Sequence, residues 1–304
     1  MNRVLVTSGL IATVLTEYGI IPKFFGSLDL AASRPAPLAK STIETISFCR
    51  ENDFITLTTV SEFRGIVLLN ELSDEVSKCV EQRQDVLLVE CRYSEAMFYK
   101  LCSIWSTSHH FDARSHLKDV MPSRGSHQNI GAFSHVEDDV HIDPTATVGP
   151  NCSIRRSIIG ENSVLQAGVR LGDDALGAVI GPGGVWYDRP HFGGVIVGSN
   201  VRIENNTVIQ AGFMEPTQIR NNCRIGPNTS IGSGVKIGEG SLIAKSVTIS
   251  GSVVVGKECR IWGGVAIREG VHIGDGAIIG MGAVILNDVP SGETWFGNPA
   301  RRKY

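Results

Sequence analysis

Residues 219–285 decide the fold, and they read IRNNCRIGPNTSIGSGVKIGEGSLIAKSVTISGSVVVGKECRIWGGVAIREGVHIGDGAIIGMGAVI. Steps of six residues from Ile219 to Ile285 meet twelve consecutive Ile or Val side chains. Four residues after each of them comes a small or β-branched side chain, as at Cys223. The residue directly after the aliphatic one is often glycine, as at Gly226.

A period of six residues fits neither the 3.6-residue period of an α-helix nor the alternation of one long strand. It indicates one short strand and one corner per repeat, so that three repeats close a triangular coil of 18 residues. The aliphatic side chains fill the interior of this prism, and we expect glycine to serve corners that need an unusual backbone angle. The repeat therefore predicts a parallel β-helix over 130–289.

Two segments break the period of six. Residues 172–194 insert a long loop, and residues 210–218 replace one six-residue step by a step of ten. Loops that project from a rigid solenoid often carry binding residues. The first loop is rich in side chains suited to binding, which are Trp186, Tyr187, Arg189 and His191.

Composition excludes several classes of function. The 304 residues are 19% charged and 42% hydrophobic, with a net charge of −3, which gives no electrostatic case for binding nucleic acid or an anionic membrane. No apolar run is long enough to span a bilayer, and the N-terminal residues lack a signal-peptide pattern. The seven cysteines are scattered without metal-binding spacing, and no histidine set suggests a metal. We expect a cytoplasmic protein with no metal.

The N-terminal part lacks the six-residue repeat. Its β-branched runs and one helical pattern predict a small α/β domain over 1–105, followed by a linker over 106–129. A tail over 290–304 follows the β-helix. The expected elements are strands at 54–60, 65–70 and 85–91 and a helix at 94–105.

The order of the segments along the chain and several local motifs together resemble one family, across nearly the whole chain. The carrying segments are ISFCRENDF (46–54), GGVWYDRPHFGGVIVGSNVRIENNTVIQAG (183–212) and GMG (280–282). They are similar to the UDP-3-O-acyl-glucosamine N-acyltransferases, which belong to the hexapeptide-repeat acyltransferases. This resemblance implies a left-handed β-helix and a homotrimer. It also implies acyl transfer to the amine of a nucleotide-linked amino sugar in lipopolysaccharide or surface glycan synthesis.

The resemblance implies a nucleotide site in the small domain. In the family, two aromatic side chains stack the uracil and an asparagine reads its edge. The corresponding residues here are Phe48, Phe54 and Glu51, so both aromatic faces are retained while the amide is replaced. A carboxylate only accepts hydrogen bonds and cannot copy an amide. The base bound here is therefore left open, and an aromatic core role for Phe48 and Phe54 is the alternative.

The catalytic positions depart further from the family pattern. Both family histidines are replaced, because they fall on Ser233 and Gly270, while the family's oxyanion donor falls on Gly251. Acyl transfer requires a base for the attacking amine and a fixed N–H for the developing oxyanion. Coil arithmetic places Glu215 one coil below Ser233 and Glu269 two coils above it. Together with His191 in the loop, these two carboxylates are the candidate bases.

The ending, DVPSGETWFGNPARRKY, resembles the coenzyme A–dependent sugar acetyltransferases of the same superfamily. It favours acetyl- or short acyl-CoA over acyl carrier protein as co-substrate, and no bound cofactor is expected. Arg301 is the candidate contact for donor phosphates, and Trp262 and Met281 are candidates for the acyl group. The rival interpretation is a catalytically inactive homologue that binds a sugar nucleotide.

Overall fold

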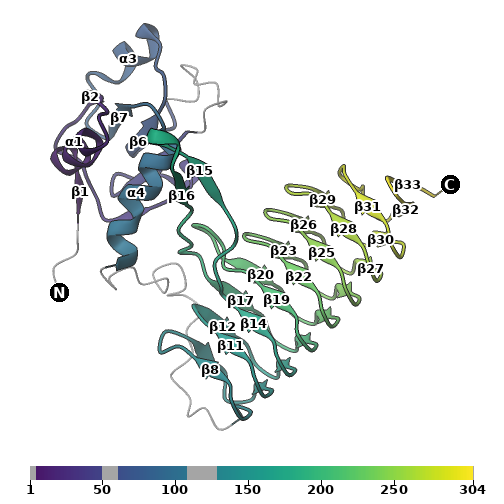
Figure 1. Cartoon of the computed structure of the whole chain (residues 1–304). Helices are drawn as coiled ribbons and strands as arrows, with labels where there is room; N and C mark the ends of the chain where they lie inside the picture. Colours follow the sequence, from purple (N-terminus) through teal and green to yellow (C-terminus); the bar gives the residue numbers. More distant parts are fainter. Residues whose placement is uncertain (1–4, 50–60, 108–128, 304) are drawn as a thin grey trace. The chain divides into compact units, whose positions relative to one another are not determined.

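A computed structural model of the chain describes residues 5–49, 61–107 and 129–303. These residues form two compact units, each discontinuous in sequence (Figure 1). The first unit comprises Met1–Asp112 with Leu176–Pro190, and the second comprises Ala113–Ala175 with His191–Tyr304. None of the helices in the described ranges is long and apolar enough to cross a membrane.

The first unit is built on a five-stranded sheet with the order β2-β7-β6-β5-β4. Strands β4 to β7 run parallel, and β2 pairs antiparallel with β7. The bounds are β2 Lys23–Gly26, β4 Arg34–Pro35, β5 Thr45–Phe48, β6 Gly65–Leu69 and β7 Val86–Glu90. A separate antiparallel pair joins β1 (Val6–Thr7) to β3 (Ala31–Ala32). Nearly continuous apolar runs in β6 and β7 are buried throughout, as expected for a parallel sheet covered on both faces.

Helices cover this sheet. Helix α4 (Ser94–Thr107) packs against β5 and β6, α1 (Ser8–Glu17) packs against α4, and α3 (Asp74–Val80) packs against β2 and β7. A short 3₁₀ helix covers Leu38–Lys40. The N-termini of α1 and α3 are capped because the Thr7 and Ser73 hydroxyls accept hydrogen bonds from backbone N–H groups. The predicted α/β character of this part is confirmed, whereas the strand expected at 54–60 lies outside the described residues.

The second unit is a parallel β-helix with three faces (Figure 1). Face 1 consists of β10 Thr147–Val148, β13 Val164–Leu165, β18 Arg202–Ile203, β21 Arg224–Ile225, β24 Leu242–Ile243, β27 Arg260–Ile261, β30 Ile278–Ile279, β32 Thr294–Gly297 and β33 Ala300–Arg302. Face 2 consists of β8 His135–Val136, β11 Ser153–Ile154, β14 Arg170–Leu171, β19 Val208–Ile209, β22 Ser230–Ile231, β25 Thr248–Ile249, β28 Ala266–Ile267 and β31 Val284–Ile285. Face 3 consists of β9 His141–Ile142, β12 Ser157–Ile159, β17 Val195–Val197, β20 Thr217–Ile219, β23 Lys236–Ile237, β26 Val254–Val255 and β29 His272–Ile273.

The register confirms the predicted coil of 18 residues. Arg224 pairs with Leu242 on face 1, and Ser230 pairs with Thr248 on face 2. The aliphatic residue of each repeat points inward, and together these side chains form one continuous buried core. Three cysteines occupy the second inward position and are buried, as expected: Cys152, Cys223 and Cys259. The predicted fold class, a mainly β chain with a parallel β-helix and a small α/β domain, is confirmed.

The expected role of the repeat glycines is wrong in one respect. Gly226 and Gly238 directly follow the aliphatic residues, and neither has a positive φ. A Cβ on them would lie 2.6 and 2.4 Å from the backbone of the next coil. Glycine is required at these two positions because neighbouring coils approach too closely to leave room for a Cβ. The left-handed backbone angle falls two residues later, at Asn228 and Gly240.

The insertion in the β-helix region folds as a hairpin. Within 176–190, β15 (Ala178–Ile180) and β16 (Trp186–Asp188) form an antiparallel hairpin around a 3₁₀ turn at Pro182–Gly184. This hairpin packs against α4 and therefore belongs to the first unit. At the C-terminal end, β32 adds in parallel to β30 and turns back into β33.

Candidate active site

All irregular steps of the β-helix lie on the edge between face 2 and face 3, here called the 2–3 edge. The shortened step from Ile154 to Ile159 joins β11 to β12, the insertion joins β14 to β17, and the ten-residue step joins β19 to β20. These three corners are stacked in successive coils. Ser233, Gly251 and Glu269 occupy the same edge in the next three coils. Coil arithmetic predicts the stack of Glu215, Ser233 and Glu269, and the strand order adds the shortened step and the insertion to the same column.

Arg156 holds the two ends of the insertion together. Its guanidinium donates to the Gly172 carbonyl at 2.6 Å, to Asp174 Oδ1 at 2.6 Å and to the His191 carbonyl at 2.5 Å. The residue has φ of 42°, a backbone conformation that is uncommon outside glycine. No motif in the sequence marks Arg156, although a third break in the period of six, the five-residue step from Ile154 to Ile159, lies beside it.

His191 lies beneath the surface of this edge. Its side chain has no exposed area, and its Nδ1 lies 3.7 Å from Asp174 Oδ1. The ring also makes an edge-on contact with Phe213, with the ring centroids 6.3 Å apart. A general base must reach the proton that it removes. In this conformation the imidazole lies below the surface at the base of the insertion, beside Asp174 and Phe213.

Glu215 stands in the ten-residue step, half-buried, one coil below Ser233. The register supports this placement because Gln218 pairs with Lys236, which is 18 residues further on. The Glu215 carbonyl is wedged between two glycines, where a Cβ on Gly193 or Gly212 would lie 2.2 or 1.7 Å from its oxygen. These glycines explain how the chain can make a long step without opening the coil.

Ser233, Gly251 and Glu269 are stacked by backbone hydrogen bonds. Ser252 N–H donates to the Ser233 carbonyl at 2.8 Å, and Gly270 N–H donates to the Gly251 carbonyl at 3.0 Å. The Glu269 carboxylate leans toward Gly251, with Oε1 3.7 Å from the point that a glycine Cβ would occupy. The structure thus brings one carboxylate close to the predicted oxyanion donor.

The Gly251 N–H is not used by the fold. Among the backbone hydrogen bonds of the described residues, this group donates to no carbonyl. Pro150 and Pro227 occupy the same place in their own repeats, and proline has no N–H. A donor that the coil does not require is available to a ligand. The role of Gly251 as oxyanion donor stays a prediction.

The predicted nucleotide residues lie in the first unit. Phe48, at the end of β5, packs against Phe98 and Tyr99 of α4 with ring centroids 4.7 and 6.0 Å apart. It is partly exposed. Glu51 and Phe54 lie outside the described residues.

Two of the predicted donor residues, Trp262 and Met281, lie on another edge, between face 1 and face 2, and the third, Arg301, lies in β33 of face 1. Trp262 and Met281 are exposed there by 44% and 81%. Arg301 pairs with Phe296, whose side chain covers Gly280. The three residues therefore gather at the C-terminal end of the β-helix. Within 5–49, 61–107 and 129–303, no cluster of three or more His, Cys, Asp or Glu side chains suits a metal ion.

Comparison with known families and sequences identifies the repeat. The bacterial transferase hexapeptide family (six repeats) matches residues 216–251 and 252–287, and the hexapeptide repeat of succinyl-transferase matches 191–211 and 234–269. A UDP-3-O-acylglucosamine N-acyltransferase of Caulobacter vibrioides is 39% identical over 154 residues, which are 51% of this chain and 45% of the relative. UDP-3-O-acylglucosamine N-acyltransferase 2 of Legionella pneumophila is 42% identical over 73 residues, 24% of this chain and 21% of the relative.

Among solved structures, UDP-N-acetylglucosamine O-acyltransferase from Moraxella catarrhalis is 20% identical, with a TM-score of 0.48, covering 57% of this chain and 73% of that one. The chain spans less than half the length of the curated relatives given above. Its β-helix is built from bacterial transferase hexapeptide repeats, and its sequence is related to the UDP-3-O-acylglucosamine N-acyltransferases, as the motifs predicted.

Proposed function

We propose that this chain transfers an acyl group from a thioester to the amine of a nucleotide-linked amino sugar, in lipopolysaccharide or surface glycan synthesis. The observation that carries the proposal is the 2–3 edge. There the insertion, the ten-residue step and the unused Gly251 N–H lie in one column of a hexapeptide β-helix. The relatives named above, which are N-acyltransferases of UDP-linked acylglucosamine, support this acceptor class.

The proposed chemistry needs three events. A carboxylate, Glu215 or Glu269, takes a proton from the amine, which attacks the thioester carbonyl and forms a tetrahedral intermediate. The Gly251 N–H donates to the oxyanion of that intermediate. The C–S bond then breaks, the new amide forms, and the thiolate leaves with a proton. Ser233 cannot act as base alone, because a hydroxyl has no suitable pKa.

The nucleotide and acyl-donor residues of the proposal are those that the sequence predicts. The nucleotide is held by the small domain at Phe48, Glu51 and Phe54. The acyl donor, coenzyme A or an acyl carrier protein, lies against the edge that carries Trp262 and Met281, with Arg301 near the donor phosphates. Because the proposed catalytic and donor residues lie on different edges of one prism, a homotrimer would bring the two kinds of edge together.

The test is release of free thiol, with product mass as confirmation. The full chain is mixed with acetyl-CoA or acyl carrier protein and with UDP-, dTDP- and GDP-linked amino sugars. Turnover with one member supports the proposal and identifies the base and sugar together. No turnover with any donor contradicts it.

A second candidate is an inactive protein that binds a sugar nucleotide. It is favoured by one observation, the presence of Ser233 and Gly270 where the resembled family has histidines. Tight binding of one nucleotide sugar without thiol release from any donor would establish this alternative. Turnover would eliminate it.

A further inference from the structure

One arginine of the second unit binds both ends of the insertion. Arg156 lies in the shortened step, and its guanidinium donates to the carbonyls of Gly172 and His191. It also pairs with Asp174 at 2.6 Å. Its backbone lies against the exit of the insertion as well, because a Cβ on Gly194 would collide with the Arg156 carbonyl. Both ends are therefore fixed to a single residue of an earlier coil.

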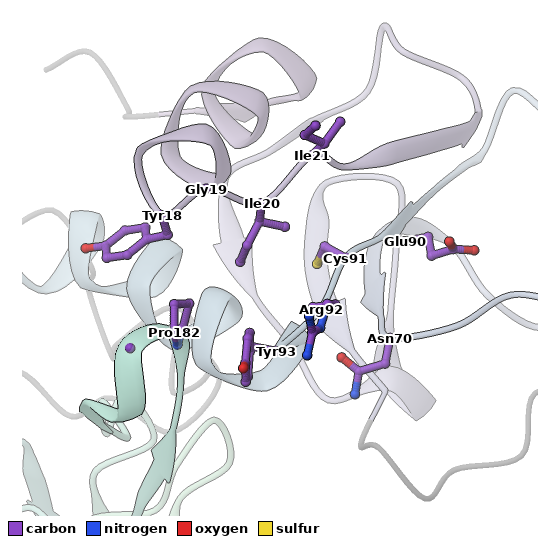
Figure 2. Close-up of a pocket in the computed structure, with 11 residues that line it drawn as sticks. Tyr18, Gly19, Ile20, Ile21, Asn70, Glu90, Cys91, Arg92, Tyr93 and Pro182 are labelled. Carbon is purple, nitrogen blue, oxygen red and sulfur yellow. The ribbon is translucent and has the colours of Figure 1, made fainter.

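The middle of the insertion is anchored separately, in the first unit. Tyr187 of β16 makes an edge-on contact with Tyr18, with the ring centroids 5.9 Å apart. Arg189 donates to the Tyr99 hydroxyl at 2.8 Å. Tyr18 and the hairpin turn at Pro182 line the same cavity of this unit (Figure 2). The hairpin and the two ends of the insertion are thus held by different residues, in different units.

The exit of the insertion is paired with the ten-residue step of the next coil. Phe192 N–H donates to the Phe213 carbonyl at 2.6 Å, and Gly194 and Gly212 form an antiparallel bridge. The Glu215 carbonyl lies so close to Gly212 that a Cβ there could not be accommodated. The path of the chain at the exit of the insertion therefore fixes where the backbone of Glu215 lies.

Thr217 carries the same constraint to the following coil. Its backbone N–H donates to the Gly194 carbonyl at 3.1 Å. Its side chain is buried, and the hydroxyl donates to the Gln210 carbonyl at 2.7 Å, across the base of the ten-residue step. The hydroxyl oxygen also accepts from Gly234 N–H at 2.9 Å, directly after Ser233. A continuous set of hydrogen bonds therefore runs from the exit of the insertion to the corner that carries Ser233.

We propose that Arg156 is a positioning residue for acyl transfer, which fixes the backbone of Glu215 and touches no substrate. The inference rests on the proposed function, with Glu215 as the base. Arginine suits this role because its planar guanidinium offers several donors in fixed directions, whereas a lysine ammonium is a point charge. Because the acceptors of Arg156 lie on both ends of the insertion, loss of the guanidinium frees both ends at once.

The first measurement is steady-state thiol release by the full chain. Arg156→Gly removes the guanidinium and tolerates the φ of 42°, so the fold should be retained, which circular dichroism checks. Its kcat should fall at least tenfold, while KM for the acyl donor stays unchanged. Guanidinium chloride, too dilute to unfold the chain, should restore part of the lost kcat because the ion fits the vacated space. Arg156→Lys should give an intermediate rate.

Arg155→Gln is the matched control. Arg155 pairs with Glu137 at 2.6 Å and with Asp173 at 3.5 Å, and Asp173 is also held by Arg170 at 2.7 Å. The control removes the same charge one residue away and leaves the contacts of Arg156 intact. Its rate should match that of the parent chain. Equal losses in Arg155→Gln and Arg156→Gly, or no loss in either, would overturn the inference.

A double variant tests whether Arg156 acts through Glu215. Glu215→Gln alone should lose at least tenfold in rate, and the addition of Arg156→Gly should then lower the rate by less than twofold, because contributions that act through one group are not additive. Additive losses would show that Arg156 acts by another route. Additive losses, or a parent rate in Glu215→Gln, would overturn the inference.

Hydrogen–deuterium exchange separates failure of this inference from failure of the proposed function. In Arg156→Gly, amides of residues 210–218 should exchange at least tenfold faster, while those of residues 236–285 match the parent chain. Unchanged exchange over 210–218 would overturn the inference even if the parent chain transfers acyl groups. Faster exchange, combined with no thiol release by the parent chain, would contradict the proposed function. It would also remove the catalytic purpose of Arg156, while confirming that this residue fixes the ten-residue step.

Discussion

At the scale of single residues, the corners of the β-helix contain some backbone N–H groups that the coil does not use and that a ligand can therefore bind. In several repeats the first turn residue donates no backbone N–H to the coil, and the second carries the positive φ, as in the pair Gly251 and Ser252. Pro150 with Asn151 and Pro227 with Asn228 follow the same pattern. A substitution at the first position can therefore change an N–H group without changing the coil.

Gly251→Pro tests the oxyanion donor. Because proline already occupies this place in two repeats, the variant should fold, with a thermal midpoint equal to or above that of the parent chain. Its acyl transfer rate should fall at least a hundredfold, which corresponds to about 3 kcal/mol in the transition state. Thiol release and thermal melting are the measurements. Ala167→Pro, at the same place in another repeat, is the control, and equal rates in both variants would remove Gly251 from the mechanism.

Glu215→Gln and Glu269→Gln test the proposed base. Each change keeps the size of the side chain and removes its ability to accept a proton from the amine. The variant of the true base should lose at least tenfold in rate, with the other close to the parent chain. Steady-state thiol release decides between them. If both variants keep the parent rate, neither carboxylate is the base.

The sequence predicted the column of candidate residues through arithmetic alone, because a solenoid with a fixed coil length converts sequence distance into position. It predicted Ser233, Gly251 and Glu269 on one edge, and the register supports that placement. The same arithmetic could not predict the burial of His191. That depends on Arg156 and Asp174 closing the base of the insertion, which no period reveals.

At the scale of elements, the insertion is the feature that sequence described least well. Its aromatic and charged residues predicted a functional loop, whereas the structure shows a hairpin packed on α4. Arg189 Nε donates to the Tyr99 hydroxyl at 2.8 Å, across 90 positions of sequence. The hydroxyl of Tyr99 donates in turn to Glu95. Pairing partners this distant follow from tertiary folding and have no local signal.

The stability that the contact between the hairpin and α4 contributes should decrease at alkaline pH. Burial, followed by the hydrogen bond to Glu95, raises the pKa of Tyr99 well above its usual range. A raised pKa contributes stability that is fully present below the unfolded value of about 10 and is lost as pH rises above it. Urea unfolding at pH 8 to 11 should therefore show a steeper loss for the parent chain than for Tyr99→Phe. Parallel losses in both proteins would contradict the role of the phenol.

At the scale of the whole molecule, the chain divides into two units whose cores do not share residues. The β-helix core is a column of inward aliphatic side chains, and the small unit has a separate cluster around β6, β7 and α3. The predicted fold class was confirmed because a sustained period leaves one architecture. The membership of the hairpin was not predicted, because it depends on packing between segments far apart in sequence.

Separate cores predict separate responses to a cavity. Ile249 is buried in the β-helix, and Ile249→Ala should cost about 2–5 kcal/mol there. Calorimetry should show a lower midpoint for the β-helix transition and an unchanged midpoint for the small unit. Leu88→Ala, in the buried face of β7, should give the reverse result. Equal shifts of both transitions would show that the two units unfold together.

The hairpin also sets an order of events during synthesis. The small unit is complete only when residues 176–190 have joined α4, which ends at Thr107. A ribosome adding about 5–20 residues per second reaches the hairpin on the order of 10 s after it has made that helix. During that interval the small unit lacks its hairpin, and seven strands of the β-helix, β8 to β14, have already been made. Folding of the small unit therefore cannot finish until residues 176–190, which lie in sequence between the two parts of the β-helix unit, have been synthesised. For the same reason, no single cut in the gene can separate the two units.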